Sequence, residues 1–126
     1  MKKRKIQSKE APEAIGPYSH GIVMENILYL SGQIGINPKA ARLVEGGLIE
    51  EVKQVFANIS SILQEAGTGF ENVVKTTVFL TDIKNFNIVN EIYAKYFREP
   101  YPARVAVGVA ALPLDAEIMI DVVAGL

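Results

Sequence analysis

The strongest hydrophobic pattern in the chain has the period of an α-helix and begins at Leu48. Apolar residues recur every three or four positions along one helix face: Ile49, Val52, Phe56, Ile59, Leu63 and Ala66. Gly67 follows at the position where a glycine commonly ends a helix. The pattern predicts an amphipathic helix from Leu48 to Ala66.

A second, shorter helical pattern follows Asp82 and Asn85, either of which can cap a helix N-terminus. Its apolar stripe consists of Phe86, Val89, Tyr93 and the pair Tyr96 and Phe97. Two prolines, at 100 and 102, end the pattern.

The remaining apolar segments have the short, β-branched and aromatic character of strands. They are Tyr18–Met24, Ile27–Ser31, Val73–Leu80, Ala103–Ala111 and Glu117–Ala124, with a loop over Gly35–Gly47. The order ββαβαββ predicts an α+β domain in which two helices cover one face of a mixed sheet.

The segment after Ala103 is apolar on both faces of the expected strand. Valines at 105, 107 and 109 alternate with small residues at 106, 108 and 110. Two helices leave one sheet face uncovered, so we expect that face to pack against another copy of the chain. A homo-oligomer makes clefts between subunits the expected ligand sites.

Composition narrows the function. The chain has 126 residues, a formal net charge of −1, no cysteine and only one histidine, His20. These counts predict a single domain over residues 1–126 and exclude disulfides, thiolate nucleophiles and clusters of His or Cys metal ligands. The basic run Lys2–Lys5 lies in residues 1–9, which we interpret as an N-terminal arm or a first edge strand. No apolar stretch is long enough to span a membrane. We expect a cytoplasmic protein without membrane or nucleic-acid partners.

Arg104 is the only charged residue between Pro102 and Leu114. A guanidinium keeps its proton when buried and fits a carboxylate with two parallel hydrogen bonds. Arg104 is therefore either half of a structural ion pair or a binding group for an acidic ligand.

Three segments resemble the RidA/YjgF family of small enamine/imine deaminases. They are Ala14-Ile15-Gly16-Pro17-Tyr18-Ser19-His20, Ser31-Gly32-Gln33-Ile34 with Asn37-Pro38, and Pro102-Ala103-Arg104. The resemblance implies a chorismate-mutase-like fold, a homotrimer with ligand clefts at the subunit boundaries, and no cofactor or metal. It also implies hydrolysis of 2-imino or 2-aminoacrylate-type acids to 2-oxo acids and ammonia.

The resemblance implies that Arg104 binds the substrate carboxylate and that catalysis depends on this residue. Tyr18, Ser31, Gly32 and Asn90 match other positions of the family's cleft. From the residues alone, Tyr18 can equally be an amphipathic rim residue and Asn90 a structural amide at the edge of the helix stripe.

The sequence departs from the family pattern at three positions. Met119, in Ile118-Met119-Ile120-Asp121, replaces the glutamate that commonly holds the attacking water. A thioether accepts hydrogen bonds weakly and moves no protons. His20 replaces a glutamine and is expected to be a hydrogen-bonded loop residue, and Ala106 replaces a common cysteine. Because of Met119, the alternative function is a non-catalytic regulatory trimer that binds small carboxylates.

Overall fold

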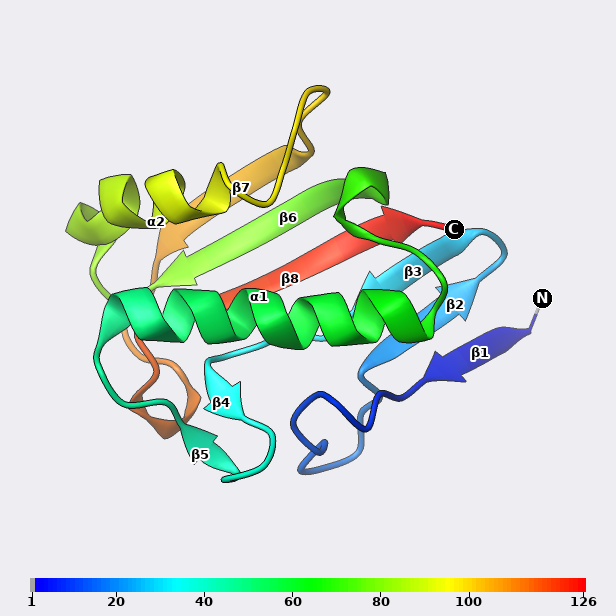
Figure 1. Ribbon diagram of the computed structural model, residues 1–126, viewed down its shortest axis with the longest axis horizontal. Coiled ribbons are helices and arrows are strands. Elements are labelled where there is room, and N and C mark those ends of the chain that lie inside the picture. Colours follow the sequence, from blue (N-terminus) through cyan, green and yellow to red (C-terminus); the bar gives the residue numbers. More distant parts are fainter. Residues whose placement is uncertain (1) are drawn as a thin grey trace.

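The computed structural model describes residues 2–126, and its main element is a six-stranded sheet with the order β1-β2-β3-β8-β6-β7 (Figure 1). The strands are β1 (Lys3–Ile6), β2 (Gly21–Met24), β3 (Ile27–Leu30), β6 (Val73–Leu80), β7 (Ala103–Gly108) and β8 (Ile118–Gly125). Only β6 and β7 are parallel, and every other pair is antiparallel. The predicted mixed sheet is confirmed.

Two helices, α1 (Leu48–Glu65) and α2 (Phe86–Tyr93), cover the same face of this sheet (Figure 1). The buried stripe of α1 packs on β8 and on α2, and Phe56 stacks on Tyr96 with 4.1 Å between ring centroids. Gly67 has φ +83°, and Thr68 N–H donates to Leu63 O at 3.0 Å. The predicted helix end is therefore confirmed, because this backbone conformation favours glycine.

The second helix begins differently from the prediction. The Asp82 side chain accepts the Lys84 N–H at 3.0 Å and so caps a short 3₁₀ turn, Ile83–Asn85, that precedes α2. Asn85 stands at the N-terminus of α2 but makes no capping hydrogen bond with its side chain.

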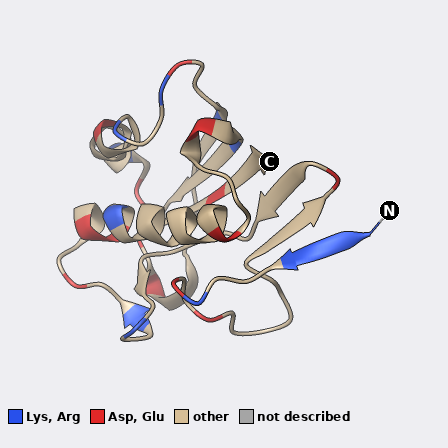
Figure 2. Ribbon diagram, turned by 45° about the vertical axis from the view of Figure 1, so that its right-hand side comes forward, with Lys and Arg blue, Asp and Glu red and all other residues tan. Residues whose placement is uncertain are grey.

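The structure adds strands that the sequence patterns did not separate. β1 pairs with β2 at the edge of the sheet, and its three basic residues, Lys3, Arg4 and Lys5, are exposed (Figure 2). The predicted loop after Gly35 contains a short hairpin of β4 (Ile36–Asn37) and β5 (Arg42–Leu43). The chain order thus has three more strands than the predicted ββαβαββ.

Two predicted strands are too long. Tyr18, Ser19 and His20 lie in the loop before β2, where the side chain of His20 bonds to other loop segments instead of extending the sheet. β7 ends at Gly108 and not at Ala111, because the chain turns into the 3₁₀ segment Pro113–Asp115.

The sheet face opposite the helices carries several large apolar side chains that are exposed in the single chain. Tyr29, Val105 and Val107 are among them. Contact with a second copy through this face stays a prediction. Within residues 2–126, no helix combines the length and the apolar character that crossing a bilayer requires.

Candidate functional site

His20 fixes the loop that carries Tyr18. Its ring is only 1% exposed, Nδ1 accepts the Ser8 N–H at 3.1 Å, and Nε2 lies 2.6 Å from Pro12 O. A backbone N–H must donate and a carbonyl must accept, so this pair of contacts defines the neutral Nε2–H tautomer. The expected hydrogen-bonded loop histidine is confirmed. Both ring nitrogens are occupied by this structural role.

In the segment after β3, the peptide N–H of Gly32 has no hydrogen-bond partner within residues 2–126. Ser31 N–H donates to His20 O, and Gln33 exchanges two backbone hydrogen bonds with Ile120. Between them, the Gly32 N–H has no acceptor among residues 2–126. The Ser31 hydroxyl donates to Ser19 O at 2.6 Å, so its proton is already used. Of the two donors expected here, only the Gly32 N–H is available to a ligand.

Met119 lies directly against Gly32. A Cβ at position 32 would stand 2.7 Å from Met119 Sδ, closer than real contacts allow. A larger residue at position 32 would therefore require the flexible Met119 side chain to shift. Met119 alternates with the buried Ile118 and Ile120, which places its side chain on the sheet face away from the helices.

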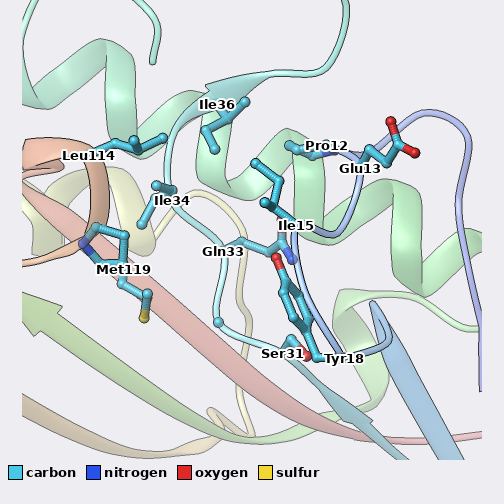
Figure 3. Close-up of a pocket in the computed structure, with 12 residues that line it drawn as sticks. Pro12, Glu13, Ile15, Tyr18, Ser31, Gln33, Ile34, Ile36, Leu114 and Met119 are labelled. Carbon is cyan, nitrogen blue, oxygen red and sulfur yellow. The ribbon is translucent and has the colours of Figure 1, made fainter. Parts of the chain in front are cut away.

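These residues surround a cavity of about 570 Å³ (Figure 3). The sequence analysis did not predict that several residues, including Ile15, Gln33 and Leu114, line this cavity. Ile15 lies within the first motif segment, but its apolar side chain, like that of Leu114, indicates no particular chemistry. The full lining is Pro12, Glu13, Ile15, Tyr18, Ser31, Gly32, Gln33, Ile34, Ile36, Pro113, Leu114 and Met119.

Arg104 lies elsewhere, on the helix-covered face of β7. Its Nη1 donates to Asn90 Oδ1 at 2.7 Å, and its guanidinium carbon stands 4.9 Å from the ring centre of Phe86 and 4.7 Å from that of Tyr93. Arg104 is exposed, and no carboxylate within residues 2–126 pairs with it. The interpretation as an ion pair inside one chain is therefore wrong.

Within one chain, the candidate residues form two separate groups. Asn90 and Arg104 line a cavity of about 440 Å³, to which Met119 and Gly32 do not contribute. Arg104 and Met119 project from opposite faces of the sheet, and β6 separates their strands. Ala106 packs against the core beside Arg104 and lines neither cavity. The structure does not bring the predicted site together in a single copy.

A buried carboxyl, Glu51, was missed by the sequence analysis although it lies four residues before Val55 on the buried face of α1. Glu51 is 6% exposed and accepts the Glu117 N–H at 2.9 Å. Burial raises its pKa above the ordinary value; the hydrogen bond from the Glu117 backbone opposes this rise, and the Glu117 charge adds to it.

Asp121 is the carboxyl that follows Met119 on the open face of β8. Burial raises its pKa, and the Thr77 hydrogen bond and the positive charge of Lys75 oppose this rise. Neither Asp121 nor Glu117 lines the cavity beside Met119. Within residues 2–126, no three His, Asp or Glu side chains gather in a metal-binding arrangement.

The family model described as Endoribonuclease L-PSP matches residues 8–126. The chain belongs to the RidA/YjgF family. It is 52% identical over 122 residues to the human 2-iminobutanoate/2-iminopropanoate deaminase, covering 97% of this chain and 89% of the human protein.

Solved structures of the Rid family have the same fold. The Rid family protein YyfA of Yersinia pestis superposes with a TM-score of 0.96 at 48% identity, covering 99% of this chain and 100% of YyfA. TdcF of E. coli, solved with bound serine, gives 0.91 at 32% identity and covers 98% of both chains. The predicted membership of the RidA/YjgF family and the α+β fold are confirmed.

Proposed function

We propose that this RidA/YjgF protein hydrolyses reactive 2-imino acids to 2-oxo acids and ammonia. Water adds to C2 of the imine and supplies the new carbonyl oxygen and two protons, the C2–N bond breaks, and nitrogen leaves as ammonia. Residues 1–126 act in this proposal as one RidA-like unit in the cytoplasm, without a cofactor. The human relative named as a 2-iminobutanoate/2-iminopropanoate deaminase supports this reaction class.

The site is proposed to form between two copies of the chain in a homotrimer. One copy would contribute Arg104 and Asn90, and its neighbour would contribute Tyr18, Gly32 and Met119. The separation of these two groups on opposite sheet faces supports this arrangement, because one chain alone offers neither group a complete site. The exposed Val105 and Val107 on β7 supply apolar surface for the contact.

The proposal rests mainly on one observation, that Arg104 is held in place but has no charged partner within residues 2–126. Its guanidinium is held at 2.7 Å by a neutral amide, Asn90, and is flanked by two aromatic rings, yet it has no carboxylate partner within residues 2–126. A positioned and uncompensated guanidinium is suited to bind a carboxylate with two hydrogen bonds. Asn90 would position Arg104 through this bond, and it lines the same cavity, where it could also contact the substrate.

The remaining groups orient the substrate around its imine carbon. The free Gly32 N–H would donate to the substrate or to the developing charge, and Tyr18 would shield the cleft from solvent. Ser31 would hold the Gly32 loop in place through its bond to Ser19. Met119 borders the cavity and takes no proton, so catalysis in this chain rests on orientation.

The second candidate function is a regulatory trimer that binds small carboxylates without turnover. Met119 favours it specifically, because the thioether occupies the space over Gly32 and no carboxyl group lines the cavity near it. Glu13 is the only acid on the lining, and it lies at the rim (Figure 3).

Ammonia release from freshly generated 2-aminoacrylate, measured for the wild type and Arg104→Ala, tests the proposal. The deaminase function predicts release by the wild type that falls at least 100-fold in the variant, while Arg42→Ala, an exposed arginine on β5, stays at the wild-type rate. Equal inactivity of wild type and Arg104→Ala, with carboxylate binding still dependent on Arg104, would support the regulatory trimer instead.

A further inference from the structure

Methionine supplies the only sulfur in this protein, and so its most readily oxidised side chains. The chain has no cysteine, and its three methionines are Met1, Met24 and Met119. A thioether sulfur takes one oxygen from a peroxide and becomes a sulfoxide. A peroxide that reaches this chain meets no thiol of the chain, so the exposure of each methionine decides where the oxygen is added.

Met119 is open to a small oxidant. It is only partly buried on β8, between the fully buried Ile118 and Ile120, and it lines the cavity of about 570 Å³ (Figure 3). Met24 is also partly buried, but it lies on β2 and does not line this cavity. Of the methionines within residues 2–126, Met119 is therefore the one whose oxidation would change the proposed site.

The surroundings of Met119 give a sulfoxide oxygen a specific partner. Sδ lies 2.7 Å from the position of a Cβ on Gly32. A Cβ stands about 2.5 Å from its own backbone nitrogen, so Sδ lies within about 5 Å of the Gly32 nitrogen. That N–H has no acceptor among residues 2–126. Rotation of the flexible side chain brings an oxygen bonded to Sδ within hydrogen-bonding distance of it.

Oxidation changes which group accepts the Gly32 N–H. A thioether is a weak acceptor, so it leaves this donor to a ligand. A sulfoxide is polar, and its oxygen competes with the ligand for the same donor. The neighbouring Ser31 hydroxyl already donates to Ser19 O at 2.6 Å, so it does not compete for the new oxygen.

We infer that Met119 is a reversible oxidation site, at which a peroxide forms a sulfoxide whose oxygen accepts the Gly32 N–H. The sulfur attacks one oxygen of hydrogen peroxide, the O–O bond breaks, and the second oxygen takes the proton of the first and leaves as water. Sulfur loses the two electrons that the peroxide gains. Two thiols of an external reductant reverse the step, because they carry the oxygen away as water and are joined in a disulfide.

In the proposed function, this modification withdraws a donor from the substrate. The consequence for binding rests on that function, in which the Gly32 N–H would donate to an acid held by Arg104 of a neighbouring copy. Losing one hydrogen bond is expected to weaken binding of the acid about tenfold. The oxidation of Met119 and the hydrogen bond to Gly32 need no ligand, so they are measured independently of the proposed function.

Treatment of the isotopically labelled full chain with hydrogen peroxide tests the inference by peptide mass spectrometry and NMR together. The peptide that contains Met119 should gain one oxygen, and the amide proton resonance of Gly32 should move downfield as it gains an acceptor. A methionine sulfoxide reductase with a dithiol should reverse both changes. Binding of 2-oxobutanoate, measured by calorimetry, should weaken about tenfold on oxidation and recover on reduction.

Met119→Leu and Met24→Leu are the matched variants. Leucine has nearly the volume of methionine and takes no oxygen from a peroxide, so both folds are expected to survive. Each variant is compared with its own untreated protein. Met119→Leu should show neither the Gly32 shift nor the change in binding, whereas Met24→Leu should show both.

The other results separate this inference from the function beneath it. An unmodified Met119, under peroxide that oxidises free methionine, overturns the oxidation site. A Met119 sulfoxide that leaves the Gly32 resonance unmoved overturns the hydrogen bond, as does an equal shift in Met119→Leu. A shifted Gly32 resonance with unchanged, Arg104-dependent binding overturns the effect on the ligand.

Failure of the proposed function gives a different result. Untreated protein that does not bind 2-oxobutanoate, or that binds it equally well after Arg104→Ala, overturns that function alone. The Gly32 resonance still reports the Met119 sulfoxide in this case, and its downfield shift supports the oxidation site.

Discussion

Replacing Met119 by glutamate would place an acid on the cavity lining beside Gly32, at the position where the resemblance predicts one. The two side chains have similar length, so the carboxyl carbon would take the place of Sδ and the oxygens that of Cε. Sδ lies 2.7 Å from the site of a Cβ on Gly32. A glutamate there would stand beside the free Gly32 N–H and beside the proposed substrate.

The expected gain follows from what the new group supplies. A positioned general base contributes about 10²- to 10⁴-fold, or roughly 3–5 kcal/mol of activation free energy. Losing the half-buried thioether costs about 1 kcal/mol of folding free energy, which leaves a folded protein. We therefore expect kcat/KM for 2-imino acid hydrolysis to rise at least 100-fold in Met119→Glu.

The assay is ammonia release from 2-iminobutanoate, generated in place and followed across pH. Met119→Gln is the matched control, because it can hold a water molecule but cannot take its proton. The gain in Met119→Glu should disappear as the pH falls below the pKa of the new carboxyl. Arg104→Ala in the Met119→Glu background should abolish it.

The opposite result is that Met119→Glu is no faster than Met119→Gln while both bind 2-oxobutanoate in an Arg104-dependent manner. The missing acid would then not be what limits turnover, and the regulatory function would gain support.

Three further predictions concern the groups that shape the site. Gly32→Ala should cost about 1 kcal/mol in urea unfolding, because the new Cβ displaces the flexible Met119 thioether, and Met119→Ala in the same chain should relieve this cost. Asn90→Ala should weaken 2-oxobutanoate binding about tenfold in calorimetry by releasing Arg104, while Asn90→Asp should weaken it further by pairing with the guanidinium. Glu51→Gln should stabilise the protein at pH 7 by about 1.4 kcal/mol for each unit by which burial raises the Glu51 pKa.

Proton linkage makes the ionisation of Glu51 destabilising at neutral pH. Its pKa in the folded chain is above the ordinary value of 4.5, so the unfolded chain loses its proton first as the pH rises. Wild-type stability should therefore fall from pH 4.5 up to the raised pKa and then stay lower. Glu51→Gln keeps an acceptor for the Glu117 N–H and removes this loss, whereas an unchanged pH profile would contradict the assignment.

The sequence predicted α1 and β6 well because both have a strong internal pattern. α1 has five turns of apolar periodicity and a terminal glycine, and β6 coincides with the predicted Val73–Leu80. β1 was left undecided as an arm or an edge strand, since edge position leaves Lys3, Arg4 and Lys5 in solvent and only Ile6 buried. Because exposed and buried residues do not alternate in β1, its sequence lacks the alternation of polar and apolar residues that identifies a strand.

The site was less predictable than the fold. Motifs identified Arg104 and the position of Met119, but no pattern in the sequence states that β6 separates their strands or that their side chains project from opposite faces. Those facts depend on the strand order, in which β8 from the C-terminus lies between β3 and β6. Likewise, Glu51 reads as a surface acid until the register of α1 against β8 is known.

In the proposed trimer, Arg104 of one copy and the Gly32–Met119 surface of another hold the same small acid. A crystal structure with 2-oxobutanoate bound tests this arrangement most directly. We expect the carboxylate on the Arg104 guanidinium with two hydrogen bonds, and C2 beside Gly32 and Met119 of the neighbouring chain. A ligand bound within a single chain, or one that leaves Arg104 in contact with Asn90 alone, would contradict the claim.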